Sequence, residues 1–204
     1  MSQIGLIDYG AGNFASVKNA LHCLELPVRD IRCPEEFELA THLILPGVGA
    51  FAPAMRRLES LHLVEPLRDA VLRQRKPLLG ICVGMQLFAT VGSEFEVYHG
   101  LGLISGAVKK LKPKADLRLP HIGWNTVEIY RPSRLFARFI EMPTFYFLHS
   151  YHLVPSDRQV VVANCNYGEE VTAAIEHENL FGVQFHPEKS QQDGLRLLQQ
   201  FASL

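Results

Sequence analysis

The chain has 204 residues, of which 48% are hydrophobic and 20% charged, and this composition suits one domain spanning residues 1–204 with a sizeable core. Its formal net charge of −1 gives no general electrostatic reason to bind nucleic acid or an anionic membrane. No apolar run approaches the ~18 residues of a membrane-spanning helix, and the first residues lack a signal-peptide pattern. We therefore expect a soluble, cytoplasmic protein.

The first half of the chain alternates short apolar runs with helical patterns. Strands are predicted at 4–7, 28–31, 42–45 and 77–81, and helices at 14–24, 63–73 and 83–90. The run at 77–81 is continuously apolar, as in a parallel strand that is covered on both faces. This alternation predicts an α/β fold with a central, mostly parallel sheet flanked by helices.

In the second half, the predicted strands follow one another at closer spacing. They lie at 108–111, 126–129, 144–148, 160–166, 171–176 and 180–184. This spacing predicts an additional mixed or antiparallel part of the fold. Ser190 and Asp193 have the spacing of a capping box, which predicts a final helix.

The segment Gly80-Ile81-Cys82-Val83-Gly84 has the pattern of a nucleophile elbow, a sharp strand-to-helix turn that presents its central residue. Glycines two residues to either side leave room for that turn. Cys82 is therefore the candidate nucleophile. The alternative is a buried cysteine at an ordinary glycine-marked strand end.

A cysteine nucleophile needs a base, because the thiolate is the attacking form. The downstream segment Phe185-His186-Pro187-Glu188 supplies a histidine with a carboxylate two residues later. On an extended backbone these two side chains point to the same side. We expect Glu188 to orient His186, and His186 to take the proton of Cys82, although each residue alone could be structural.

Acyl transfer also needs hydrogen-bond donors for the developing oxyanion. The N–H of Val83, at the predicted helix start, is one candidate, and Val48 and Gly49 in Pro46-Gly47-Val48-Gly49 could supply a second. The alternative for the glycine stretch is a tight strand-to-helix connection. The glycine stretch lacks the Lys-Ser/Thr pair of a phosphate loop.

The four cysteines show no paired zinc spacing, and we expect neither a metal nor a cofactor.

The elbow, continued by Met85 and Gln86, and the segment 185–188 resemble the glutamine amidotransferases with a Cys-His-Glu triad, whose glutaminase domain has a flavodoxin-like sheet. Within that family the chain is similar to the glutaminase subunits of imidazole glycerol phosphate synthase. The similarity spans nearly the whole chain and is most specific in Asp8-Tyr9-Gly10-Ala11-Gly12-Asn13, Pro120-His121-Ile122-Gly123-Trp124-Asn125, 45–51 and 149–151. The stretch 93–99 departs from the glycine-rich, acidic pattern of the family and leaves the mouth of the site undefined.

The resemblance implies hydrolysis of L-glutamine to glutamate through a thioester on Cys82. The ammonia would pass to a separate β/α-barrel cyclase subunit, forming a heterodimer that makes imidazole glycerol phosphate and aminoimidazole-carboxamide ribonucleotide in histidine biosynthesis. Rotation of the glycine-flanked Val48 peptide would switch the oxyanion hole.

The resemblance also implies two further sets of residues. Trp124 and Asn125 would lie at the partner interface, although a lone Trp is more often part of a core. The glutamine would be held by Gly47, Gln86, His149, Ser150 and Tyr151. For Gln86 the alternative is an amide satisfied by nearby backbone, and for 149–151 it is a structural turn.

Three other functions use the same residues. They are a glutaminase subunit of another amidotransferase synthase, a catalytically silent binding subunit, and a cysteine peptidase on a similar sheet. The intact triad argues against the silent subunit, and the amidotransferase segments argue against the peptidase.

Overall fold

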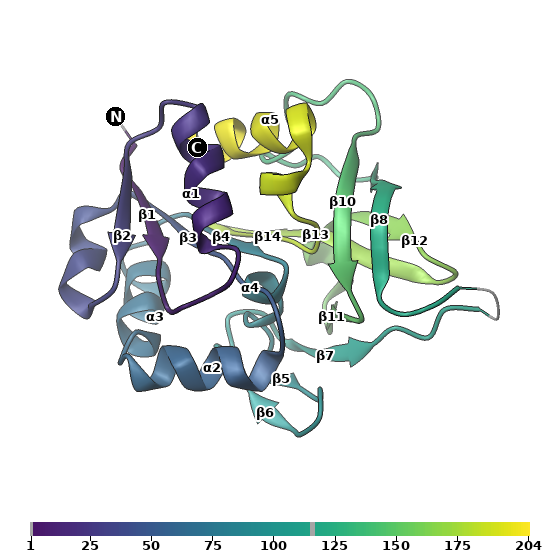
Figure 1. Cartoon of the computed structure of the whole chain (residues 1–204), viewed down its shortest axis with the longest axis horizontal. Helices are drawn as coiled ribbons and strands as arrows, with labels where there is room; N and C mark the ends of the chain where they lie inside the picture. The colour runs from purple at the N-terminus through teal and green to yellow at the C-terminus, as the bar shows by residue number, and fades with distance from the viewer. Residues whose placement is uncertain (1, 115–116) are drawn as a thin grey trace.

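The computed structural model describes residues 2–114 and 117–204, and its centre is an eight-stranded sheet (Figure 1). Five strands at one end of the sheet run parallel, in the order β2 (Val28–Ile31), β1 (Ile4–Ile7), β3 (His42–Leu45), β4 (Leu78–Ile81) and β14 (Leu180–Val183). Antiparallel strands complete it, in the order β13 (Glu170–His177), β12 (Val161–Asn166) and β9 (Glu128–Ile129). The predicted α/β fold with a mostly parallel central sheet is confirmed.

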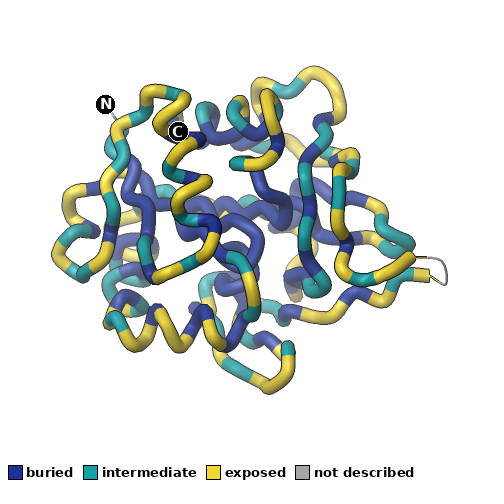
Figure 2. The backbone as a smooth tube through the Cα atoms, in the orientation of Figure 1, coloured by how far each residue is buried: buried dark blue, intermediate teal, exposed yellow. Residues whose placement is uncertain are grey.

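Helices cover both faces of this sheet. In Figure 1, α1 (Phe14–Cys23) and α5 (Gln191–Ala202) lie on one side, and α2 (Phe51–Ser60) and α3 (Val64–Leu72) lie on the other. Every residue of β1, β3, β4 and β14 is buried, which explains why these strands are apolar without alternation. Figure 2 shows the buried backbone concentrated in this central layer.

Two helices differ from the prediction. Helix α2 was missed, although Phe51, Ala54, Met55 and Leu58 are buried at helical spacing; its proline lies in the first turn, where proline is tolerated. Helix α4 (Val83–Gln86) ends four residues early. The carbonyls of Leu87, Phe88 and Ala89 accept hydrogen bonds from the loop 101–104, so the backbone after Gln86 pairs with that loop.

Two small sheets lie beside the edge of the large sheet at which the parallel strands end and the site is found. One has the order β11 (Tyr151–Pro155), β7 (Gly106–Lys110), β5 (Val91–Gly92) and β6 (Tyr98–His99), and the other pairs β10 (Thr144–His149) with β8 (His121–Thr126). Strands β5 and β6 have two residues each, too few to give a hydrophobic pattern. The predicted strand 126–129 proves to be the end of β8 followed by β9.

The 3₁₀ helices are η1 (Pro34–Leu39), η2 (Arg158–Val160) and η3 (Pro187–Lys189). The predicted capping box before α5 is wrong. The Ser190 hydroxyl donates to the His186 carbonyl at 2.6 Å and accepts from the Tyr146 N–H, while Asp193 accepts from the Thr144 N–H. Ser190 thus ties β10 to the segment that carries His186, and Asp193 ties β10 to α5. No helix of the described residues is long and apolar enough to cross a membrane.

Candidate active site

Cys82 lies at the sharp turn between β4 and α4. Its φ of 54° and ψ of −110° are a conformation that residues other than glycine rarely adopt. The Cys82 N–H donates to the Val183 carbonyl at 2.8 Å, which fixes the turn to β14. A Cβ at Gly84 would lie 1.9 Å from the Leu45 carbonyl oxygen, so close backbone approach requires glycine there. The turn has the geometry of a nucleophile elbow.

His186 and Glu188 form a hydrogen-bonded pair. Nδ1 of His186 lies 2.8 Å from Oε1 of Glu188, and both side chains are fully buried. The same carboxylate oxygen accepts a second hydrogen bond, of 3.0 Å, from Nδ2 of Asn13. The expectation of an extended backbone through this pair is wrong, because η3 begins at Pro187 and its turn brings the carboxylate to the ring.

The two neighbours of His186, Cys82 and Glu188, favour the protonated form of its ring. Burial lowers the pKa of His186, but the interactions with Cys82 and Glu188 outweigh burial and raise that pKa to about 10. The buried Nε2 makes no hydrogen bond of ordinary geometry within the described residues. No other protein group occupies this nitrogen, so it can hold the proton that Cys82 gives up as the thiolate forms, as a general base requires.

The Cys82 side chain opens toward a cavity of about 230 Å³, slightly smaller than typical small-molecule sites and suited to an amino acid. Loops before α2, the elbow, the start of β8 and the β10–β11 junction contribute its walls. The lining residues are Val48, Gly49, Cys82, Val83, Gln86, Glu94, Pro120, Leu148, His149, Ser150 and Tyr151. A larger groove of about 650 Å³ lies between η1 and α3, but the residues that line it include no cysteine, serine or histidine.

The three residues predicted for the oxyanion hole meet at this cavity. The N–H groups of Val48, Gly49 and Val83 donate no hydrogen bond within the described part of the chain, so each can serve a ligand. The base of the glycine stretch is held by Tyr9, whose buried hydroxyl donates to the Pro46 carbonyl at 2.8 Å. Burial, followed by the charge of Cys82, raises the Tyr9 pKa, so this hydroxyl stays protonated.

Four of the five residues predicted to hold glutamine line the cavity, and Gly47 does not. A Cβ at Gly47 would lie 2.6 Å from the Gly84 nitrogen, which places Gly47 behind the elbow. Both ring nitrogens of His149 have protein partners, the Tyr151 carbonyl and His121. Burial and then the neighbouring His121 lower the pKa of His149 to about 3. His149 is therefore neutral and leaves its backbone, rather than its ring, for a ligand.

Two residues near the nucleophile were missed by the sequence analysis. Glu94 is the sole acidic residue among the described residues that line the cavity, and its Oε2 accepts from the Phe51 N–H at 3.0 Å. Gln184 is fully buried, with Nε2 3.6 Å from Sγ of Cys82. The position of Gln184 two residues before His186 was the one available signal. Nothing in the sequence connects Glu94 with Cys82.

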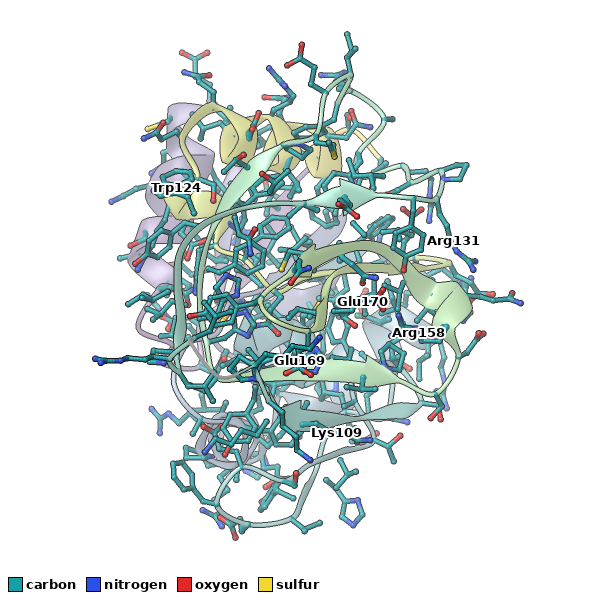
Figure 3. The ribbon with its side chains drawn as sticks, turned by 90° about the vertical axis from the view of Figure 1, so that its right-hand side faces the viewer. Lys109, Trp124, Arg131, Arg158, Glu169 and Glu170 are labelled. Atoms are coloured by element: carbon teal, nitrogen blue, oxygen red, sulfur yellow. The ribbon has the colours of Figure 1, made fainter. Side chains whose placement is uncertain are left out.

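Trp124 and Asn125 of β8 differ in their exposure and contacts. Trp124 is 49% exposed and its ring lies edge-on to Tyr146. Figure 3 shows Trp124 apart from the charged residues Arg131, Arg158 and Glu170. The amide of Asn125 instead donates inward, to the Asn166 carbonyl and toward His121.

Across residues 2–114 and 117–204, no group of three or more His, Cys, Asp or Glu could hold a metal ion.

Residues 5–203 match the family described as glutamine amidotransferase class-I. The chain is 46% identical to the imidazole glycerol phosphate synthase subunit HisH of Moorella thermoacetica, covering 100% of this chain and 96% of that protein. It is 45% identical to the same subunit of Zymomonas mobilis, covering 98% and 95%.

Solved structures agree on the fold. A crystal structure described as a glutamine amidotransferase superposes with a TM-score of 0.76 at 20% identity, covering 98% of this chain and 99% of that one. The structure of PurLQS from Thermotoga maritima gives 0.74 at 18% identity, covering 100% and 99%. The chain therefore belongs to the class-I glutamine amidotransferase family, in the group of imidazole glycerol phosphate synthase HisH subunits.

Proposed function

We propose that this protein, acting as a single glutaminase domain, hydrolyses L-glutamine to glutamate and ammonia through a thioester on Cys82. It is the glutaminase subunit of an imidazole glycerol phosphate synthase in histidine biosynthesis. The main observation in support of this reaction is the strained elbow of Cys82 beside the buried His186–Glu188 pair. A peptidase would need an open groove for a chain, whereas this cavity is about 230 Å³.

In the acylation half of the reaction, Nε2 of His186 takes the proton of Cys82, and the thiolate attacks the side-chain carboxamide carbon of glutamine. The N–H of Val83 and those of the glycine stretch stabilise the oxyanion. The imidazolium then gives its proton to the departing nitrogen, and the carbon–nitrogen bond breaks to release ammonia. Glu188, at 2.8 Å from Nδ1, stabilises the positive charge of the ring during these steps.

In the deacylation half, a water molecule attacks the γ-glutamyl thioester and His186 accepts a proton from it. The same N–H groups stabilise the second oxyanion. The carbon–sulfur bond breaks and the Cys82 thiolate leaves as glutamate is released. The proton on His186 then returns to Cys82, which regenerates both groups. His149 cannot replace His186 as the base, because both of its ring nitrogens are occupied.

We assign the α-ammonium of glutamine to Glu94, the sole carboxylate among the described residues that line the cavity. Opposite charge in a confined site favours that orientation. Ser150 and Tyr151, at the β10–β11 junction, bind the other polar groups of the amino acid through their backbone. Gln86 shapes the cavity floor, since its amide is already bonded to the Tyr151 carbonyl at 2.8 Å.

The proposed partner is a β/α-barrel cyclase subunit that receives the ammonia, and the relatives named above are themselves called subunits. Exposed apolar side chains of β8, Ile122 (58% exposed) and Trp124 (49%), support a protein contact there. The inward hydrogen bonds of Asn125 favour a supporting role for it rather than a direct contact. A cytoplasmic location stays a prediction.

We propose that the partner controls hydrolysis through rotation of the Val48 peptide. Gly49 has a φ of +94° and a Cβ there would meet nothing within 4 Å, so this peptide can turn at low steric cost. Structures of the complex with glutamine, with and without the cyclase nucleotide, test it. One unchanged Val48 peptide orientation in both would contradict the proposal.

The function is tested by measuring glutamate release from glutamine, first with the protein alone and then with the cyclase and its nucleotide. We expect the partner to raise turnover and imidazole glycerol phosphate to form. Cys82→Ala should lower glutamate release by more than about a thousandfold, whereas Cys23→Ala, at an exposed cysteine, should not. Absence of glutamate from the wild-type complex would favour a silent binding protein. Stimulation only by another synthase would favour the related amidotransferase.

A further inference from the structure

Gln184 lies between the end of β14 and His186 and has no role in the mechanism given above. Its side chain is fully buried, and its Nε2 lies 3.6 Å from Sγ of Cys82. We propose that Gln184 is a further catalytic residue, whose side-chain amide donates a hydrogen bond to the Cys82 sulfur and stabilises it as a thiolate. The inference rests on the proposed function, because it names a second group that acts on the same nucleophile.

The proposal requires that Gln184 turns its NH₂ group, rather than its oxygen, toward the sulfur. Amide nitrogen and oxygen must be assigned from the hydrogen-bond network. The Gln86 amide lies 2.8 Å from the Tyr151 carbonyl, which can only accept, so Gln86 presents its Nε2 there. The same Nε2 lies 3.1 Å from the Gln184 amide and donates to its Oε1. The remaining group of Gln184, its NH₂, therefore faces Cys82.

A chain of histidines reinforces this assignment from the other side of the Tyr151 carbonyl. That carbonyl lies 2.9 Å from Nδ1 of His149, which must donate. Nε2 of His149 then accepts from Nδ1 of His121 at 3.0 Å. Nε2 of His121 in turn accepts from Asn125, whose amide nitrogen is fixed by the Asn166 carbonyl. Each link has a single allowed direction, so the Tyr151 carbonyl holds two donors, His149 and Gln86.

The thiol and the thiolate of Cys82 find different hydrogen-bond partners around the sulfur. The Leu148 carbonyl, 3.9 Å from Sγ, can accept from a thiol but cannot stabilise a thiolate. A thiolate needs donors, and hydrogen bonds to an ionised group are the stronger kind. Among the described residues, Gln184 is the side chain whose N–H lies within hydrogen-bond distance of the sulfur in ordinary geometry. The titratable groups that face this region are His186, Tyr9, Glu94 and His149.

The test follows alkylation of Cys82 by iodoacetamide across about pH 5 to 9, with the Cys82 peptide quantified by mass spectrometry. We expect Gln184→Met, which keeps the side-chain length but removes the donor, to move the midpoint of the profile to higher pH. Alkylation near neutral pH should be about tenfold slower. Gln200→Met is the matched control, because Gln200 is also buried and hydrogen-bonded but lies on α5. Its profile should coincide with that of the wild type.

Gln184→Glu is the second variant, because it preserves the shape and the acceptor for Gln86 while placing a carboxylate at the sulfur. It should shift the profile in the same direction as Gln184→Met, and it decides the matter if that variant does not fold. Folding is checked by thermal unfolding. Profiles of folded Gln184 variants that coincide with the wild type would overturn the proposal. Alkylation requires no glutamine, so this result is separate from failure of the wild-type complex to release glutamate.

Discussion

Asn13 donates a hydrogen bond of 3.0 Å from its Nδ2 to Oε1 of Glu188, 175 positions away in the sequence. Asn13 is also the N-cap residue of α1, yet its side chain accepts no capping hydrogen bond. An asparagine at that position normally caps the helix. Its side chain instead holds the carboxylate oxygen that accepts from His186, which makes Asn13 a positioning residue for the triad.

We expect Asn13→Ala to lower kcat for glutamate release by about tenfold with little change in KM, since loss of one hydrogen bond to a charged group loosens Glu188. Steady-state kinetics of the complex measures both parameters. The matched control is Asn19→Ala, which removes an exposed asparagine of the same helix. Equal kcat values for Asn13→Ala and the wild type would mean that η3 positions Glu188 without help from Asn13.

Glu94 provides a prediction about substrate affinity. Glu94→Gln keeps an oxygen that can accept from the Phe51 N–H but removes the negative charge proposed to bind the α-ammonium. KM for glutamine should rise by about tenfold or more with kcat little changed, because a charged hydrogen-bond partner of the substrate is lost.

The control for this measurement is Glu96→Gln, which alters a carboxylate two residues away that is paired with Arg56 at the surface. An unchanged KM for Glu94→Gln would leave Glu94 as a cap for α2 and remove it from the substrate site.

The raised pKa of His186 predicts a loss of stability at alkaline pH. Burial lowers this pKa, but Cys82 and Glu188 raise it overall from 6.5 to about 10 in the folded protein. A folded-state pKa above the unfolded value stabilises the protein fully below pH 6.5, and this stabilisation is lost as the pH rises through about 10. Urea unfolding at a series of pH values should therefore show a declining free energy of unfolding over that range.

Cys82→Ala separates this contribution from other alkaline effects. It removes the interaction with the sulfur and leaves Glu188 in place, so the decline should become shallower. Cys23→Ala, at an exposed cysteine, should keep the wild-type slope. The same slope in Cys82→Ala as in the wild type would show that Cys82 does not support the charge on His186.

The parts of this protein that could be predicted from the sequence are those encoded locally. Strand β4 and its elbow are adjacent in the chain, and a continuous apolar run followed by Gly-x-Cys-x-Gly specifies both. His186 and Glu188 were also recognised, although the geometry assumed for them was wrong. In an extended strand, side chains two residues apart share a face, whereas here the turn at the start of η3 brings Glu188 to the ring. The spacing of the two residues does not distinguish these geometries.

The residues that could not be predicted are brought to the site by the tertiary fold. Glu94 follows a two-residue strand, Asn13 begins a helix at the other end of the chain, and neither has a local pattern that points to Cys82. Ser190 shows the reverse error. Its spacing to Asp193 fits a capping box, but its hydroxyl bonds to the His186 carbonyl, four residues earlier, and to the Tyr146 N–H, which the packing of β10 brings within reach.

The buried His121–His149 pair predicts a loss of stability in acid. Burial lowers the pKa of His121 from 6.5 to about 4, and the folded protein therefore keeps its ring neutral. A histidine with a lowered folded-state pKa stabilises the protein fully above pH 6.5, and that contribution is lost as the pH falls through about 4. His121→Phe preserves stacking on Phe147 and Tyr167 and should make the pH dependence of the unfolding free energy shallower over this range. Some dependence should remain, because burial also lowers the pKa of His149. His22→Phe, at an exposed position of α1, should keep the wild-type dependence. If His121→Phe also kept it, protonation of His121 would not be what destabilises the protein in acid.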